Sequence, residues 1–278
     1  MVRNISTVVL CAPTVSDQAQ CPARGEIKYM LIKGFLTKKL RIFYNWIRGY
    51  SFGDPARNGE YHFARSYISN GMIVFDVGAH VGDYADYILS LGKNVEIHCF
   101  EPVDSVFQKL KERFDHRAKN EGVFLNAVGL SDKPELATMK IYGDLIASNS
   151  LYESVSTDNH LCGASFHEAA VKLITIDEYM DEKEVDHIDM LKIDVEGHEL
   201  GVLQGASRAL AAGKIACIQF EYCIWFKDAG ITLEQVYILL SRYKYTLFRL
   251  MPIGKICVSK FKPCLENYQF SNWVALRT

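Results

Sequence analysis

Short apolar segments alternate with amphipathic ones over most of the chain, and this alternation predicts its secondary structure. The stretch MIVFDV at 72–77 is apolar, and a glycine-containing turn joins it to a segment of helical spacing that ends near Gly92. The same order recurs with VEIHCF at 95–100 and a helical stretch at 103–120, and GVFLNAVG at 122–129 predicts a third strand. Strands and helices in this order are typical of right-handed βαβ units. We therefore predict an α/β fold with a mainly parallel sheet.

The alternation lapses between Ser131 and Ser165 and then resumes. Within this interval SDKPELATMKIYG at 131–143 predicts a short excursion strand, and the polar, Ser- and Asn-rich stretch 144–165 predicts an inserted loop that could act as a mobile lid. The remaining expected elements are helices at 61–69, 176–181, 198–212 and 232–243, and strands MLKIDV at 190–195, KIACIQFEY at 214–222, YTLFRL at 245–250 and NWVALRT at 272–278.

The N-terminal part of the chain has a different pattern from the rest. We expect residues 1–25 to form a flexible tail and residues 26–69 a helical extension or cap, ahead of a main domain at 70–278. Between Lys28 and Tyr50, apolar residues recur at helical spacing among basic ones. The simpler interpretation is a helix packed on the domain with a solvated basic face. The alternatives are peripheral membrane contact through 28–50, or a cap over a substrate pocket.

Composition and charge narrow the class of protein. The chain has 278 residues and a formal net charge of −2, which does not favour electrostatic binding of nucleic acid. No apolar stretch approaches the length of a transmembrane helix. Its 8 cysteines are scattered without a C-x-x-C pair, which favours reduced thiols and a cytoplasmic location over a disulfide framework or a zinc site.

The first predicted strand leads into a glycine turn that indicates a cofactor. Asp76, Gly78 and Gly82 form the pattern D-x-G-x-x-x-G, which differs from the closer glycine spacing of dinucleotide-binding loops. Glu101 lies at the tip of the next strand, where an acid commonly accepts hydrogen bonds from ribose hydroxyls. Because Asp76 could accept from a ligand ammonium, the pattern favours a ligand with ribose and an ammonium group but no phosphate. S-adenosylmethionine fits this description.

Four stretches together resemble the FkbM family of S-adenosylmethionine-dependent methyltransferases. They are FDVGAHVGDY, FEPVDSVFQKL, LNAVGLSD and LKIDVEGHELGVLQGA, and the resemblance covers about Gly71 to Tyr222. It implies a Rossmann-like class I methyltransferase fold with a seven-stranded sheet, and O-methylation of hydroxyls on sugars, glycolipids and other small natural products. His80 stands where the family often has Asn, so no role is assigned to it. The implied cofactor contacts are Asp76, Gly78, Ala79 and Gly82 for the methionine moiety, Glu101 for the ribose, and Asn126 and Ala127 for the adenine edge.

The stretch MLKIDVEGHEL places Lys192, Asp194 and Glu196 at alternate positions, which share one face of a strand. Ligands of α/β sheets bind beyond the carboxyl ends of the strands, so the two acids are expected at the active site, with Lys192 as the buried counter-charge of Asp194. Asp194 is the first candidate for positioning the acceptor. His198 is the candidate general base, and the alternative for it is a solvent-facing residue at a helix start.

Glu221, at the end of IQFEY, is expected at the tip of the neighbouring strand. It could orient the acceptor hydroxyl, or join Asp194 in holding a divalent cation, although no ligand spacing compels a metal.

The sequence thus predicts an S-adenosylmethionine-dependent O-methyltransferase acting on a small hydroxylated acceptor, such as a sugar or glycoconjugate. The alternatives are an NAD-dependent oxidoreductase, which the glycine spacing disfavours, and a non-catalytic cofactor-binding scaffold. Nucleic-acid methylation is disfavoured because no N/D-P-P-Y/F motif and no basic aromatic stripe accompany the core. The sequence does not indicate the acceptor or the oligomeric state.

Overall fold

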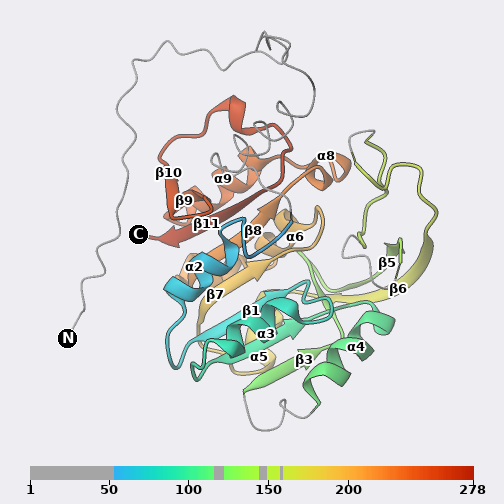
Figure 1. Cartoon of the computed structure of the whole chain (residues 1–278), viewed down its shortest axis with the longest axis horizontal. Coiled ribbons are helices and arrows are strands. Elements are labelled where there is room, and N and C mark those ends of the chain that lie inside the picture. The colour runs from blue at the N-terminus through green and yellow to red at the C-terminus, as the bar shows by residue number, and fades with distance from the viewer. Residues whose placement is uncertain (1–52, 116–121, 144–148, 157–158) are drawn as a thin grey trace.

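The computed structural model of the protein describes residues 53–115, 122–143, 149–156 and 159–278 (Figure 1). The predicted tail at 1–25 and the predicted helix within 28–50 lie outside these residues. In the described part, the predicted alternation of strands and helices is present, and the α/β class is confirmed. No helix there is both long enough and apolar enough to cross a membrane.

The main sheet has eight strands in the order β10-β9-β11-β8-β7-β1-β2-β3. Its central strands β3, β2, β1, β7 and β8 run parallel, as predicted, and β11 runs antiparallel between β8 and β9. The strands are β1 (Ile73–Val77), β2 (Glu96–Phe100), β3 (Val123–Asn126), β7 (Ile188–Ile193), β8 (Ile215–Tyr222), β9 (Tyr245–Leu250), β10 (Lys255–Val258) and β11 (Ser271–Arg277).

The eighth strand is a departure from the predicted seven. β10 pairs antiparallel with β9 at the edge of the sheet, across a turn at 251–254. It has only four residues, and the two in the middle are exposed while the two at its ends are half-buried, so the segment is too short and has no alternation from which a strand could be predicted.

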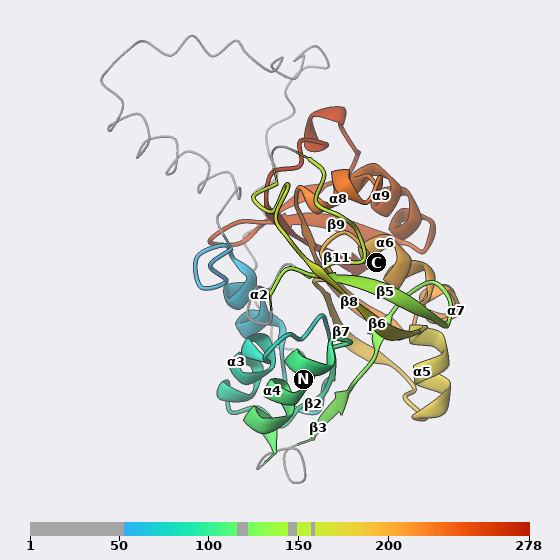
Figure 2. The same ribbon diagram turned by 90° about the vertical axis from the view of Figure 1, so that its right-hand side faces the viewer.

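A second, three-stranded sheet interrupts the βα alternation, in the order β4-β6-β5. It consists of β4 (Gly129–Leu130), β5 (Glu135–Ile141) and β6 (His167–Ile174), and β5 pairs antiparallel with β6 over its whole length. The predicted excursion strand is therefore confirmed as β5. The stretch 149–156 that follows β5 lies near the carboxyl ends of the main strands (Figure 2).

Helices cover both faces of the main sheet (Figures 1 and 2). One apolar core joins α2, α3 and α4 to one face of the sheet, and a second joins α5, α6, α7 and α9 to the other. The helices are α2 (Glu60–Tyr67), α3 (Asp83–Ser90), α4 (Asp104–Phe114), α5 (Ile176–Glu182), α6 (Glu199–Gln204), α7 (Ser207–Ala212), α8 (Trp225–Asp228), α9 (Leu233–Arg242) and the 3-10 helix η1 (Pro263–Leu265).

The single helix predicted at 198–212 is wrong in one respect, because the segment forms two short helices. The chain turns at Gly205, where a Cβ atom would lie 1.9 Å from the carbonyl oxygen of Ser131. The buried carboxylate of Asp177 then accepts hydrogen bonds from the N–H groups of Arg208 (2.7 Å) and Ala209 (2.9 Å) at the start of α7. A side chain distant in sequence thus caps a helix that local propensity would continue.

The cysteines of the described residues are mostly free. Cys99, Cys217 and Cys223 are buried thiols, and Cys162 and Cys257 are exposed ones. Cys264, by contrast, is disulfide-bonded, so the prediction of reduced thiols is wrong for this residue.

Candidate active site

Lys192, a buried residue of β7, links β7 to the neighbouring strand β1 at the centre of the sheet. In the strand register Asp76 lies beside Lys192, and Lys192 beside Gln219. Lys192 Nζ lies 3.1 Å from Asp76 Oδ1 and 3.3 Å from Asp194 Oδ2, which confirms the predicted pairing with Asp194. Burial alone would lower the pKa of Lys192, but the two carboxylates raise it above its ordinary value. The lysine therefore stays charged and makes the burial of Asp76 tolerable.

The predicted row of Lys192, Asp194 and Glu196 along one face of β7 ends earlier than expected. β7 stops at Ile193, and the chain then turns through Glu196 and Gly197, both with positive φ. Glu196 therefore does not continue the row of Lys192 and Asp194 along one strand face. Asp194 remains at the strand tip, with its N–H bonded to the carbonyl of Val77 at 3.0 Å.

The two glycines of the D-x-G-x-x-x-G pattern have different structural roles. A Cβ at Gly78 would lie 1.8 Å from the carbonyl oxygen of Asp194, so the glycine allows the loop after β1 to approach the end of β7. A Cβ at Gly82 would meet Phe114 and Leu110 at 2.4 and 2.7 Å, so this glycine lets α4 pack against the loop.

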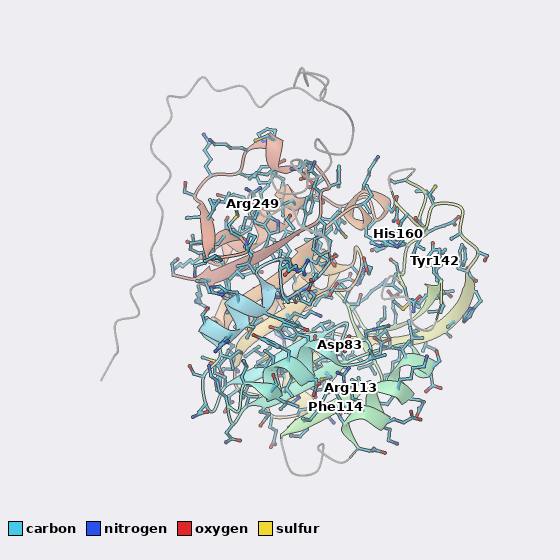
Figure 3. The ribbon with its side chains drawn as sticks, in the orientation of Figure 1. Asp83, Arg113, Phe114, Tyr142, His160 and Arg249 are labelled. Carbon is cyan, nitrogen blue, oxygen red and sulfur yellow. The ribbon has the colours of Figure 1, made fainter. Side chains whose placement is uncertain are left out.

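The guanidinium of Arg113 on α4 holds the same loop from the other side. It pairs with Asp83 at 2.5 Å and donates a hydrogen bond to the carbonyl oxygen of Val81 at 3.1 Å. Figure 3 shows Asp83, Arg113 and Phe114 together beside the start of α3.

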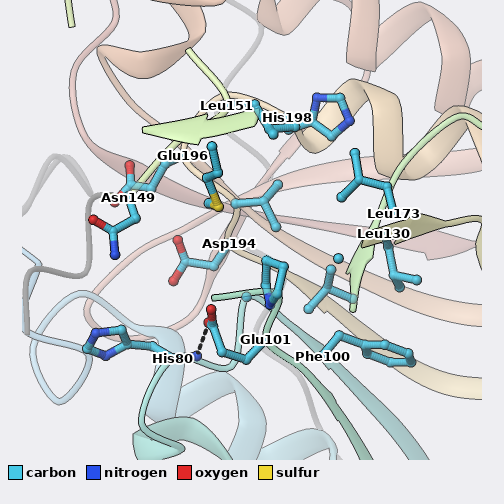
Figure 4. A pocket seen from close by; sticks show the side chains of 16 residues that line it. His80, Phe100, Glu101, Leu130, Asn149, Leu151, Leu173, Asp194, Glu196 and His198 are labelled. Carbon is cyan, nitrogen blue, oxygen red and sulfur yellow. Dashed lines mark hydrogen bonds between the residues drawn. The ribbon is translucent and has the colours of Figure 1, made fainter. Parts of the chain in front are cut away.

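A cavity lies at the carboxyl ends of β1, β2 and β7, and its empty space is about 640 Å³ with the open solvent at its mouth included (Figure 4). One part of its wall is polar and contains Glu101, Asp194, Glu196, His80 and Asn149. The other part is apolar. Its lining there includes Val77, Phe100, Pro102, Leu130, Met139, Leu151, Leu173 and Val195. A wall divided in this way suits a ligand with one polar and one apolar end.

Glu101 lies at the tip of β2 and is held by the backbone. Its carboxylate accepts hydrogen bonds from the N–H groups of His80 (3.1 Å, drawn in Figure 4) and Val103 (2.9 Å). Burial raises the pKa of Glu101 to about 7, although these two donors oppose the rise. The carboxylate therefore has a fixed orientation toward the cavity, as hydrogen bonding to ribose hydroxyls requires.

Two buried polar atoms near the glycine turn have no partner in the described structure. They are Nε2 of His80, whose side chain lines the cavity, and Oδ2 of Asp76, which is fully buried behind the loop. Unpaired buried polar atoms are uncommon in native proteins and are consistent with a site that a polar ligand completes.

His198 lines the cavity, but protein groups engage both nitrogens of its ring. Nδ1 lies 2.9 Å from the hydroxyl of Tyr152, and Nε2 lies 2.9 Å from Oγ of Ser131. Ser131 donates its own proton to Asp132 at 2.9 Å, so its oxygen accepts from the Nε2–H of His198, and Nδ1 accepts from Tyr152. Burial lowers the pKa of His198, which favours this neutral form. His198 is the N-cap residue of α6 and is half-buried.

The stretch 149–156 is attached to the site by several hydrogen bonds. Besides the Tyr152 contact, Ser150 Oγ donates to the carbonyl oxygen of Glu196 at 2.7 Å. The N–H of Ser156 donates to Asp228 on α8 at 2.8 Å. This part of the predicted loop therefore forms one side of the cavity, through Asn149 and Leu151.

Glu221 lies next to the end of β8, among other acids. Burial raises its pKa well above the ordinary value, and Asp194, Glu196, Glu199 and Glu60 raise it further. One oxygen each from Glu196 and Glu221 and the sulfur of Cys223 lie within 4.8 Å of one another, so a cation would meet this set of donors. Asp194, the partner predicted for Glu221 in holding a cation, is not one of these three residues.

The structure brings together some of the predicted site residues. Gly78, Glu101, Asp194 and His198 line the cavity, whereas Asp76, Ala79, Gly82, Asn126, Ala127 and Glu221 do not. The amide of Asn126 donates to the backbone carbonyls of Cys99 (3.1 Å) and Phe124 (3.3 Å), which joins the ends of β2 and β3. The apolar wall from β5, β6 and the 149–156 stretch was missed, because only tertiary contact brings those segments to the site.

Comparison with known proteins identifies the family. Residues 76–247, more than half of the chain, match the FkbM methyltransferase domain. The chain belongs to the FkbM methyltransferase family. The resemblance in sequence is thereby confirmed, and the order β3-β2-β1-β7-β8-β11-β9 is the predicted Rossmann-like class I methyltransferase fold with β10 added at its edge.

Two curated proteins are similar to parts of this chain. The hexuronic acid methyltransferase AglP of Haloferax volcanii is 31% identical over 172 residues, which are 62% of this chain and 62% of AglP. The antimetabolite synthetase AmbE of Pseudomonas aeruginosa is 27% identical over 54% of this chain and only 8% of its own length. Among solved structures, an FkbM methyltransferase from Methylobacillus flagellatus has 15% identity and a TM-score of 0.48, covering 86% of this chain and 59% of its own.

Proposed function

We propose that this FkbM-family protein is an S-adenosylmethionine-dependent O-methyltransferase that acts on a hydroxyl of a small acceptor, a sugar or glycoconjugate. The observation that carries the proposal is the cavity at the carboxyl ends of β1, β2 and β7, where Gly78, Glu101 and Asp194 meet. The curated relative AglP, a hexuronic acid methyltransferase, supports a sugar as acceptor.

The residues present fit the proposed cofactor. Glu101 would accept hydrogen bonds from the ribose hydroxyls, and the turn from Gly78 to Gly82 would hold the methionine moiety, where Nε2 of His80 has no hydrogen-bond partner among the described residues. The apolar wall with Leu130, Met139 and Leu173 would receive the adenine. When bound, the cofactor supplies an electrophilic methyl group on a sulfonium.

The catalytic role falls on the acids at the tips of β7 and β8. Asp194 is 35% exposed and lines the cavity, so we assign it the positioning of the acceptor hydroxyl and acceptance of its proton as the C–O bond forms. Glu221 would orient the acceptor from the neighbouring strand. His198 has no lone pair free for an acceptor proton while Tyr152 bonds to it, so its proposed contribution is to hold the 149–156 stretch in place.

A methyl-transfer assay tests this proposal. Labelled S-adenosylmethionine is incubated with a panel of sugars, and labelled methyl ethers are expected, with a product ratio of one S-adenosylhomocysteine per methyl group. Asp194→Asn should lower kcat by about 100-fold or more and leave affinity for S-adenosylhomocysteine within about threefold. The isosteric change Asp181→Asn, at an exposed position of α5, is the matched control. Tight binding of NADH without binding of S-adenosylhomocysteine would contradict the proposal.

A further inference from the structure

Acidic side chains from three segments converge beside the cavity. Glu60 comes from the start of α2, Asp194 follows β7, and Glu221 lies on β8. We call these three residues the acidic cluster. Each acts on the pKa of another: Asp194 raises the pKa values of both Glu60 and Glu221, and Glu60 raises that of Glu221. The cluster adjoins the cavity through Asp194, which lines it.

Within the described residues, one basic side chain forms an ion pair with the acidic cluster, and this side chain also pairs with an acid outside the cluster. Lys192 is bound to Asp194 and also to Asp76, which is fully buried. No Lys or Arg is among the described residues that line the cavity. Lys192 is therefore the one basic group paired with these acids within the described residues. Burial and mutual repulsion raise the pKa of Glu60 to about 7 and the pKa of Glu221 well above its ordinary value, so both favour their protonated forms until a cation binds beside them.

Buried amides next to the cluster have polar atoms without partners. Asn272 of β11 lies opposite Glu221 in the antiparallel register, so the two side chains share a face of the sheet. Asn272 is only 4% exposed, and its Nδ2 has no hydrogen-bond partner in the described structure. Gln219, two residues before Glu221, donates to Glu60 Oε1 at 2.9 Å and leaves its own Oε1 unpaired. Unsatisfied amides beside repelling carboxylates are consistent with a ligand that supplies both charge and hydrogen bonds.

We propose that the acceptor of this enzyme is a hydroxyl compound that carries a protonated amine, such as an amino sugar. This proposal rests on the proposed function and names its substrate class. The ammonium group is held by Glu221 and Glu60, the amide of Asn272 bonds to a neighbouring hydroxyl, and Asp194 faces the hydroxyl that receives the methyl group. An acceptor with a carboxylate, such as the hexuronic acid of the relative AglP, is disfavoured, because none of the described residues that line the cavity is a Lys or Arg that could pair with it.

The segment that supplies Glu60 lies before residue 76, where the match to the FkbM domain begins. Asn58 caps the N–H of Glu60 through Oδ1 at 2.9 Å, and both Asn58 and Gly59 are buried. The position of Glu60 is thus fixed by the fold, and part of the acceptor selectivity comes from outside the matched domain.

Binding of four related sugars tests the proposal. Glucosamine, N-acetylglucosamine, glucose and glucuronic acid are titrated into the full chain by calorimetry, in EDTA, with and without S-adenosylhomocysteine. Glucosamine should bind at least about tenfold more tightly than the two neutral sugars, and glucuronic acid should show no measurable binding. N-acetylglucosamine keeps the size and removes the charge.

Variants of the acidic cluster test which residue causes the preference for glucosamine. Glu221→Gln should reduce the preference for glucosamine about tenfold, and Glu221→Lys should shift it toward glucuronic acid. Glu234→Gln, at an exposed position on α9, is the matched control and should leave the order unchanged. Unchanged melting temperatures show that the variants fold.

Several results would overturn the proposal: equal affinities for the four sugars, no binding of glucosamine, or tighter binding of glucuronic acid. The titration is repeated with Mn²⁺ in place of EDTA, to test for a cation bound at Glu196, Glu221 and Cys223. Binding of glucuronic acid only in the presence of the metal would also overturn the proposal. Failure of S-adenosylhomocysteine to bind would contradict the proposed function, while the order of the sugars would still decide the acceptor class.

Discussion

At the scale of single residues, carboxyl groups with raised pKa values define the chemistry of this site. Burial raises the pKa of Glu101 to about 7 and that of Glu199 to about 8. Glu199 is 1% exposed and accepts from the N–H groups of Val195 (3.2 Å) and Gly197 (3.1 Å), which hold the turn after β7. The first acid is placed to contact a ligand, and the second maintains the turn that places Asp194 and Glu196.

Glu101 should make cofactor binding dependent on pH. Its ionised form accepts hydrogen bonds from ribose hydroxyls better than its protonated form, so affinity for S-adenosylhomocysteine should rise about tenfold between pH 6 and pH 8. Glu101→Gln should bind more weakly and without this pH dependence. Calorimetry at both pH values measures the effect, and a variant with wild-type affinity would remove Glu101 from the cofactor site.

Glu199 should make the protein less stable as pH rises. The folded protein holds this proton up to about pH 8, whereas the unfolded chain loses it near the ordinary value of 4.5, so unfolding releases a proton between these limits. Stability from this group is present below pH 4.5 and is lost as pH rises through 8. Glu199→Gln should therefore gain up to about 3 kcal/mol relative to wild type between pH 5 and pH 8. Urea denaturation at both pH values measures the gain. A constant difference would contradict the assignment.

Substitution of Gly78 should destabilise the protein far more than substitution of another glycine with a similar positive φ. Gly78→Ala is expected to cost about 3 kcal/mol or more, because the new Cβ would overlap the carbonyl oxygen of Asp194 at 1.8 Å. Gly71 is the matched control, with φ of 80° against 79° and no atom within 4 Å of the position that a Cβ would take, so Gly71→Ala should cost only about 1 kcal/mol. Equal losses in urea denaturation would contradict the close approach.

At the scale of elements, the 149–156 stretch is attached to the turn after β7 through Tyr152, His198 and Ser150. The sequence predicted a loop here from composition but could not predict its contacts, because Ser131 and Tyr152 are 67 and 46 residues from His198. The sequence suggested a general base at His198 from its residue type alone. The partners of its two ring nitrogens, Ser131 and Tyr152, could not be predicted for the same reason.

Removing the Tyr152 hydroxyl should loosen this stretch. Tyr152→Phe is expected to cost about 1 kcal/mol of stability, to speed hydrogen exchange within 149–156, and to raise the KM for the acceptor more than it lowers kcat. Tyr243→Phe, at the end of α9, is the matched control. Unchanged exchange in 149–156 would show that Tyr152 does not hold the stretch.

At the scale of the whole molecule, the sequence predicted the parallel sheet and its central strands, because apolar runs and glycine turns are local signals. The predicted Lys192–Asp194 pair is present because side chains two positions apart along an extended chain point to the same side and lie next to each other. The edge strand β10, the division of the 198–212 helix and the place of Glu60 beside Gln219 could not be predicted. Each depends on a partner distant in sequence or on a short segment with no clear period. The boundary between an extension at 26–69 and a domain at 70–278 remains a prediction, and α2 packs into the same apolar core as α3.

The most direct test of the account is a crystal structure of the protein with S-adenosylhomocysteine. We expect the ribose hydroxyls within hydrogen-bond distance of Glu101, the amino acid portion at the turn from Gly78 to Gly82, and the sulfur facing Asp194. Binding of the ligand away from this cavity, or in it with Glu101 and Asp194 out of contact, would contradict the account.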